Sequence, residues 1–245
     1  MAAMDVYWEV GVYKSMMMGM VSRCFAALRV GLGGLLLCGA GGSWAGFITD
    51  NEAGLDAIFS QSGFGSSPID TRFNAPLSVA NSALLSIDSD AEFSSLSSLS
   101  VFSPPKTINL FFVDTITFCG VAGSFIGCSS TPGNVIVVSS SFAAGAQGAI
   151  LEAHEIGHNL GLDHVAGSST NLMNPIISSN SSLTASQITS ILGSSLVQVS
   201  AGQRFLSITP IAVVASVPEP QTWAMLSLGL LGVIGWVRRR KACAI

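Results

Sequence analysis

The most constraining feature of this chain is an eleven-residue stretch that holds all three of its histidines, His154, His158 and His164. Residues four apart lie on one face of an α-helix, so His154 and His158 can direct two imidazole nitrogens at one point. Gly161 tolerates the backbone angles that end a helix, and a turn there can return His164 as a third nitrogen. Three protein ligands leave one position of a tetrahedral zinc ion open, as in zinc sites that perform chemistry. The spacing therefore predicts a zinc site at these three residues.

Glu155 follows His154 directly, which places its carboxylate beside the predicted metal rather than on it. That position suits a general base that takes a proton from a water at the metal. The whole pattern, HExxHxxGxxH, resembles the metzincin family of zinc endopeptidases. The resemblance implies a peptide-bond hydrolase with a polypeptide substrate and Glu155 as its catalytic residue. An alternative hypothesis is a non-catalytic surface or extracellular-matrix protein whose zinc only stabilises the fold.

Metzincins also carry a methionine in a tight turn beneath the metal, and Asn171-Leu172-Met173-Asn174-Pro175 is similar to that Met-turn. The resemblance gives Met173 the role of an apolar floor rather than a ligand. The two tyrosines of the chain are Tyr7 and Tyr13, near its start. Stabilisation of an oxyanion must therefore rely on zinc and backbone N–H groups.

The fold class expected from the resemblance and the residue patterns is α+β. The resemblance implies a metzincin-like catalytic domain with a twisted mixed sheet, backed by an active-site helix and a C-terminal helix. Alternating or β-branched residues predict strands at 69–74, 107–113 and 134–138, and residues 203–216 are also rich in β-formers. An alanine-rich segment predicts the active-site helix at 143–160. A capping-box pattern at Thr184 and Gln187 predicts the start of the C-terminal helix.

The resemblance further implies an edge strand along the active-site cleft, where a substrate peptide can add to the sheet. Residues 134–139 are a candidate for this edge strand. The alternative is an ordinary interior strand.

The N-terminal residues 1–45 resemble a secretory leader. Basic residues precede an apolar run at 30–40, and Ser43-Trp44-Ala45 fits a signal-peptide cleavage site before Gly46. Residues 46–216 are then the mature body, the predicted zinc metalloprotease domain.

The C-terminal residues 217–245 contain a Pro-Glu-Pro motif, an apolar stretch at 223–237 and a basic cluster at 238–241. One interpretation is a short transmembrane stop-transfer helix with its basic end in the cytoplasm. The three-part order also resembles the PEP-CTERM sorting signal of Gram-negative bacteria, which an exosortase processes. That resemblance implies anchoring in the inner membrane before processing, and a cell-surface or extracellular location after it. The residues that carry the resemblance are Pro218, Glu219, Pro220, Arg238, Arg239 and Arg240.

The mature body holds three basic and eleven acidic residues, a net charge of −8 with neutral histidines. Such an acidic surface excludes nucleic acid as a partner. The acidic clusters Asp50, Glu52, Asp56 and Asp88, Asp90, Glu92 could bind structural calcium, or could simply be solvated surface.

Cys119 and Cys128 are the two cysteines of the mature body. In an oxidising compartment the simplest prediction is a disulfide between them, and a pair of free thiols is the alternative.

Overall fold

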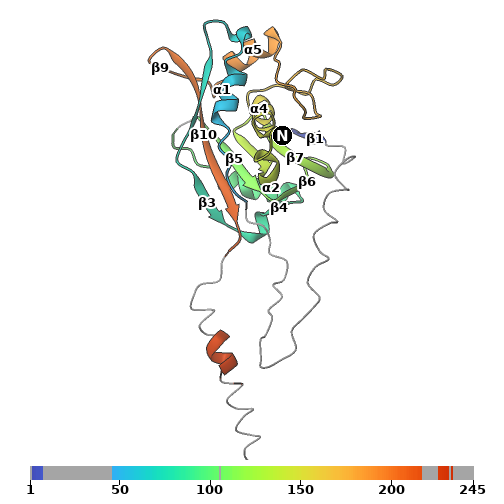
Figure 1. The fold of residues 1–245 in the computed structure, drawn as a ribbon, viewed down its shortest axis with the longest axis vertical. Helices are drawn as coiled ribbons and strands as arrows, with labels where there is room; N and C mark the ends of the chain where they lie inside the picture. Colours follow the sequence, from blue (N-terminus) through green and yellow to red (C-terminus); the bar gives the residue numbers. More distant parts are fainter. Residues whose placement is uncertain (1, 8–45, 105, 217–225, 232, 234–245) are drawn as a thin grey trace, which may run out of the picture.

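The computed structural model describes residues 2–7, 46–104, 106–216, 226–231 and 233. Within these residues, a mixed β-sheet packs against helices on both of its faces (Figure 1). This arrangement confirms the predicted α+β class with a twisted mixed sheet.

The sheet contains ten strands among the described residues. The main path runs β2-β10-β5-β8-β7-β6-β4, while β1 pairs with β7 and both β3 and β9 pair with β10. The strands β2, β10, β5 and β8 are mutually parallel along this path, and β7 is antiparallel to both of its path neighbours. The strands are β1 (Ala2–Tyr7), β2 (Ile69–Phe73), β3 (Leu77–Ala80), β4 (Ser86–Ile87), β5 (Thr107–Val113), β6 (Thr115–Phe118), β7 (Ala122–Thr131), β8 (Val135–Ser139), β9 (Gln198–Ser200) and β10 (Gln203–Val214).

Five α-helices and two single 3-10 turns lie within residues 46–216. The expected C-terminal helix begins at its capping box: the Thr184 hydroxyl accepts the Gln187 N–H at 3.3 Å, and the Gln187 side chain accepts the Thr184 N–H at 2.9 Å. The helices are α1 (Glu52–Phe59), α2 (Asp90–Ser98), α3 (Ser140–Ala143), α4 (Gly148–Asn159) and α5 (Ala185–Gly193), with turns η1 (Ser62–Phe64) and η2 (Ser82–Leu84).

The central strand β5 explains why the sheet must be covered on both faces. All seven of its residues are buried. Ile108, Leu110 and Phe112 belong to the core beneath α1 and α4. Phe111 and Val113 point the other way, into the core with Leu96 of α2. Side chains alternate between the faces of a strand, so an uninterrupted apolar run requires a layer on each side.

The predicted helix at 143–160 is wrong in its first part. The chain forms the short helix α3, turns at residues 144–147, and only then enters α4. Gly145 and Gly148 bound this turn, and both are poor helix formers. A Cβ at position 148 would overlap the carbonyl oxygen of Ala143. The two glycines therefore lie where the chain turns from α3 into α4.

The strand at 134–139 is interior, which confirms one of its two predicted alternatives and excludes the other, the edge strand. β8 lies between β5 and β7. The strand next to it, β7, packs against α4, and its residues 125–131 pair on their outer side with β1. The strand that borders α4 is thus β7, a serine- and glycine-containing segment that the residue patterns did not identify.

The two ends of residues 46–216 lie against each other. Gly46 is buried, and its N–H donates to the carbonyl of Val213 near the end of β10 at 2.8 Å. A Cβ at position 46 would be 2.7 Å from that same carbonyl oxygen, so only glycine fits without a shift.

The terminal predictions fall mainly outside the described residues. This holds for the signal peptide, apart from residues 2–7, and for Pro218, Glu219, Pro220, Arg238, Arg239 and Arg240. Within the apolar stretch 223–237, residues 226–231 are helical. No helix in the described part of the chain has both the length and the apolar character needed to cross a membrane.

Candidate metal centre

The three histidines meet at one point. His154 and His158 come from one face of α4, and His164 returns from the loop that follows it. The Nε2 atoms of His154 and His158 are 3.1 Å apart, and His164 Nε2 lies 3.2 Å and 3.1 Å from them. Ligands ~2.0–2.1 Å from a tetrahedral ion lie ~3.3 Å from one another. The three nitrogens therefore have the spacing of ligands around a small ion.

Backbone carbonyls set the orientation of the two helical histidines. His154 Nδ1 donates to the carbonyl of Leu172 at 2.7 Å, and His158 Nδ1 donates to that of Leu162 at 2.7 Å. A carbonyl can only accept, so the proton of each neutral ring is on Nδ1 and the Nε2 lone pair is bare. The site thus presents bare lone pairs to one another, an arrangement that a cation would stabilise.

Burial keeps these rings neutral. It lowers the pKa of His154 to about 3 and that of His158 to about 4, with a smaller contribution from the neighbouring histidines. Burial also lowers the pKa of His164. Neutral imidazole is the form that binds a metal, so the rings are ready for one across the physiological pH range.

The loop after α4 brings in the third histidine through a glycine turn. Gly161 has a φ of +93°, which side chains rarely adopt, and its N–H donates to the carbonyl of His158 at 2.9 Å. The N–H of Val165 then donates to the carbonyl of Met173 at 2.7 Å. His164 is partly exposed and borders a cavity of about 270 Å³ between this loop and α5. The site is therefore open on the side of its third histidine.

Glu155 lies beside the three histidines and is not part of their ligand group. Its side chain is fully buried, and its Oε2 accepts a hydrogen bond from the Ser129 hydroxyl on β7 at 2.5 Å. Its Oε1 has no partner among the described residues. Burial raises the pKa of Glu155 to about 8, although the Ser129 hydrogen bond lowers it. One carboxylate oxygen thus remains available for a proton.

The predicted Met-turn packs directly against α4. Met173 is fully buried, and a Cβ at Gly157 would be 2.5 Å from its sulfur. Asn171 holds the turn, because its side-chain oxygen accepts the Met173 N–H at 2.9 Å. Asn171 and Gln187 of α5 also exchange two amide hydrogen bonds, at 2.9 and 3.1 Å. The turn that orients His154 is therefore tied to α5.

Cys119 and Cys128 form the predicted disulfide, with an S–S distance of 2.04 Å. The bond joins the end of β6 to β7 and lies in the core beneath α2, on the face of the sheet away from α4. The alternative of free thiols is wrong.

Neither acidic cluster forms a group of potential metal ligands. Among the described residues, the three histidines are the only group of three or more such side chains close enough to share an ion. The carboxylates bind the backbone instead: Asp50 accepts the Glu52 N–H, Asp56 accepts the Thr71 N–H and Glu92 accepts the Asp88 N–H. The predicted structural calcium therefore finds no support in these clusters.

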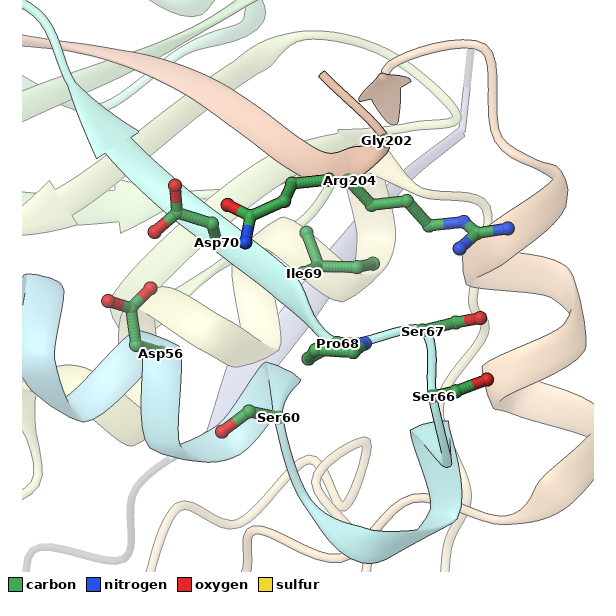
Figure 2. Close-up of a pocket in the computed structure, with 10 residues that line it drawn as sticks. Asp56, Ser60, Ser66, Ser67, Pro68, Ile69, Asp70, Gly202 and Arg204 are labelled. Atoms are coloured by element: carbon green, nitrogen blue, oxygen red, sulfur yellow. The ribbon is translucent and has the colours of Figure 1, made fainter. Parts of the chain in front are cut away.

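A cavity of about 490 Å³ lies elsewhere, at the starts of β2 and β10. Figure 2 shows the carboxylates of Asp56 and Asp70 at its wall, with Arg204 on the other side. Asp56 accepts two hydrogen bonds from Thr71, and Asp70 pairs with Arg72 at 2.7 Å. None of the predicted metal or catalytic residues lines this cavity, so the chemistry of the histidines is separate from it.

Sequence reasoning missed several supporting groups. It did not identify Ser129, because nothing in its surroundings marks 122–131 as the strand that borders α4. The carbonyls of Leu162 and Leu172 could not be found either, since every residue carries one. The Asn171–Gln187 pair had a partial signal, because Gln187 belongs to the recognised capping box.

Two segments of the chain match models of known families. Residues 106–165, from the start of β5 to just past the third histidine, match metallo-peptidase family M12B, reprolysin-like. Residues 216–241 match the PEP-CTERM protein-sorting motif. Searches of curated proteins and of solved structures gave no match. The two matches and the histidine cluster confirm the resemblance to a metzincin-type metallopeptidase with a PEP-CTERM tail.

Proposed function

We propose that this protein is an exported zinc-dependent endopeptidase. The observation that carries the proposal is the meeting of three imidazole Nε2 atoms, 3.1–3.2 Å apart, beside a buried carboxylate that has one oxygen without a partner among the described residues. The match of residues 106–165 to a metallopeptidase model supports it.

The donor set fits zinc better than the alternatives. Three imidazole nitrogens without a carboxylate or thiolate suit a borderline ion, whereas magnesium and calcium prefer oxygen ligands. Zinc held by His154, His158 and His164 would acidify a water and polarise the carbonyl of the scissile bond.

Glu155 moves the proton in this proposal. Its unpartnered Oε1 takes a proton from the attacking water, while Oε2 stays bound to Ser129. The same oxygen then gives the proton to the leaving amine, which cannot depart as an anion. The raised pKa of Glu155 suits a group that must both take up and release a proton.

The outer edge of β7 is the proposed place for the substrate. Residues 125–131 accept an antiparallel strand, because β1 of the same chain pairs there. The residues of β1 lie in the predicted leader, so removal of residues 1–45 would free this edge. A peptide added in the same way would run past Gly127 and Ser129, two β7 residues that lie against Glu155.

The ends of the chain supply the proposed route of export. The leader at 1–45 directs the chain across the inner membrane, and the tail that matches the sorting motif is recognised by an exosortase. Processing then releases the body at the cell surface or outside the cell. The disulfide between Cys119 and Cys128 is compatible with this oxidising environment.

Cleavage of an unfolded protein substrate tests the proposal, with the zinc-loaded protein isolated after export and lacking residues 1–45, so that the outer edge of β7 is open. The parent should cleave, a chelator should stop it, and Glu155→Gln should lower kcat by ~10²–10⁴-fold, the usual contribution of a general base. Glu152→Gln is the matched control, since Glu152 is also a buried glutamate of α4 but contacts Asn51 instead of the site. It should retain activity.

The alternative is the non-catalytic, zinc-stabilised surface protein. It predicts one bound zinc, loss of stability on chelation, and no cleavage by the parent of any of several unfolded substrates. That combination of results would replace the enzyme proposal.

A further inference from the structure

Strand β7 presents a glycine and a serine to the carboxylate of Glu155. Gly127 and Ser129 are two residues apart, so they lie on the same face of the strand. The Ser129 hydroxyl donates to Oε2 of Glu155 at 2.5 Å, and neither side chain has exposed surface. A Cβ at position 127 would overlap Oε1 and would be 2.8 Å from Cδ of Glu155. The carboxylate is therefore held at one oxygen and given room at the other.

This contact restricts which oxygen of Glu155 can act. A buried carboxylate without a partner could rotate, and its two oxygens would be equivalent. The Ser129 hydroxyl removes that equivalence, because an O–H donor 2.5 Å from Oε2 takes one of its lone pairs, whereas both lone pairs of Oε1 have no donor among the described residues. Oε1 stays without a partner among the described residues, and a side chain at position 127 would overlap it.

We propose that Ser129 is a positioning residue, which acts through Glu155 and fixes Oε1 as the oxygen that accepts the proton, while Gly127 leaves the room that this orientation needs. The inference rests on the proposed function. It adds that a strand residue beside the substrate edge controls the turnover rate, and that neither zinc binding nor substrate affinity depends on it.

The test compares Ser129→Ala and Ser129→Thr with Ser130→Ala in the zinc-loaded protein that is isolated after export and lacks residues 1–45. Ser130 is the matched control, because it is a buried serine of β7 whose hydroxyl contacts Val135 and not Glu155. Ser129→Ala should lower kcat by ~10–100-fold, the effect of losing a hydrogen bond to a charged group. KM, zinc content by metal analysis and the thermal unfolding midpoint should stay near those of Ser130→Ala. Ser129→Thr keeps the hydroxyl and should recover most of kcat.

The outcomes separate this inference from the proposed function. A parent without activity would overturn both. Two results with an active parent would overturn the inference alone. In the first, the kcat of Ser129→Ala is within twofold of that of the parent. In the second, the kcat of Ser129→Thr is as low as that of Ser129→Ala. If Ser129→Ala does not fold, Gly127→Ala decides: its methyl should displace Oε1 and lower kcat at least ~10-fold with zinc retained, and parent-like turnover would refute the inference.

Discussion

Replacing Gly157 with alanine should test how closely the Met-turn packs on α4. The new Cβ would be 2.5 Å from Met173 Sδ and 3.2 Å from its Cε, against ordinary contacts of ~3.5–4.0 Å. Met173 has no exposed surface into which it can move. Such overpacking costs ~1–3 kcal/mol, while alanine gains ~1 kcal/mol over glycine within a helix. We expect a net destabilisation of ~0–2 kcal/mol in the parent.

The sign of this effect should change when Met173 is removed. Met173→Ala alone should cost ~2–5 kcal/mol through the cavity that it leaves. In that background alanine at 157 meets no sulfur, so only the gain of ~1 kcal/mol in helix propensity remains. Urea unfolding of the zinc-loaded parent, the two single variants and the double variant measures all four stabilities. Equal effects of Gly157→Ala in both backgrounds would refute the packing argument.

Three further predictions concern stability. Replacing Cys119 and Cys128 with alanine should cost ~2–3 kcal/mol in urea unfolding, since the bond closes a loop with a sequence separation of 9; an unchanged midpoint would contradict this. Burial raises the pKa of Glu152 from 4.5 to about 8, so its neutral form stabilises the fold at low pH, and this contribution is lost as pH rises from 4.5 through 8. Thermal unfolding should therefore show Glu152→Gln gaining on the parent by at least ~2–4 °C between pH 5 and pH 8, and parallel curves would exclude this origin. Gln187→Ala leaves the buried amide of Asn171 without its partner and should lower the free energy of unfolding by ~1–3 kcal/mol. A loss no larger than that of Ser190→Ala, an exposed substitution on α5, would contradict a stabilising role for the Asn171–Gln187 hydrogen bonds.

The parts of the fold that could be predicted are those where a residue pattern has one physical meaning. The uninterrupted apolar run of β5 requires burial on both faces, and the capping box at Thr184 fixes where α5 begins. The start of α4 could not be predicted, because alanines that favour a helix surround Gly145 and Gly148, the two glycines at the turn between α3 and α4. The position of β8 inside the sheet depends on long-range pairing, which local sequence does not encode.

The candidate site shows the same division. His154, His158 and His164 were found because their spacing is dictated by one helix and one turn, and the structure brings their Nε2 atoms together. Ser129 was not found, although it contacts Glu155 directly. It comes from a strand 26 residues earlier, and the chain has so many serines that none of them alone predicts a contact with Glu155.

The hydrogen bond between Gly46 and Val213 has a consequence for any shortened version of the protein. It holds the two ends of residues 46–216 against each other, although they are far apart in the sequence. A truncation that removes either end would leave a backbone group of the other end without its partner, so both ends must be kept when these residues are produced on their own.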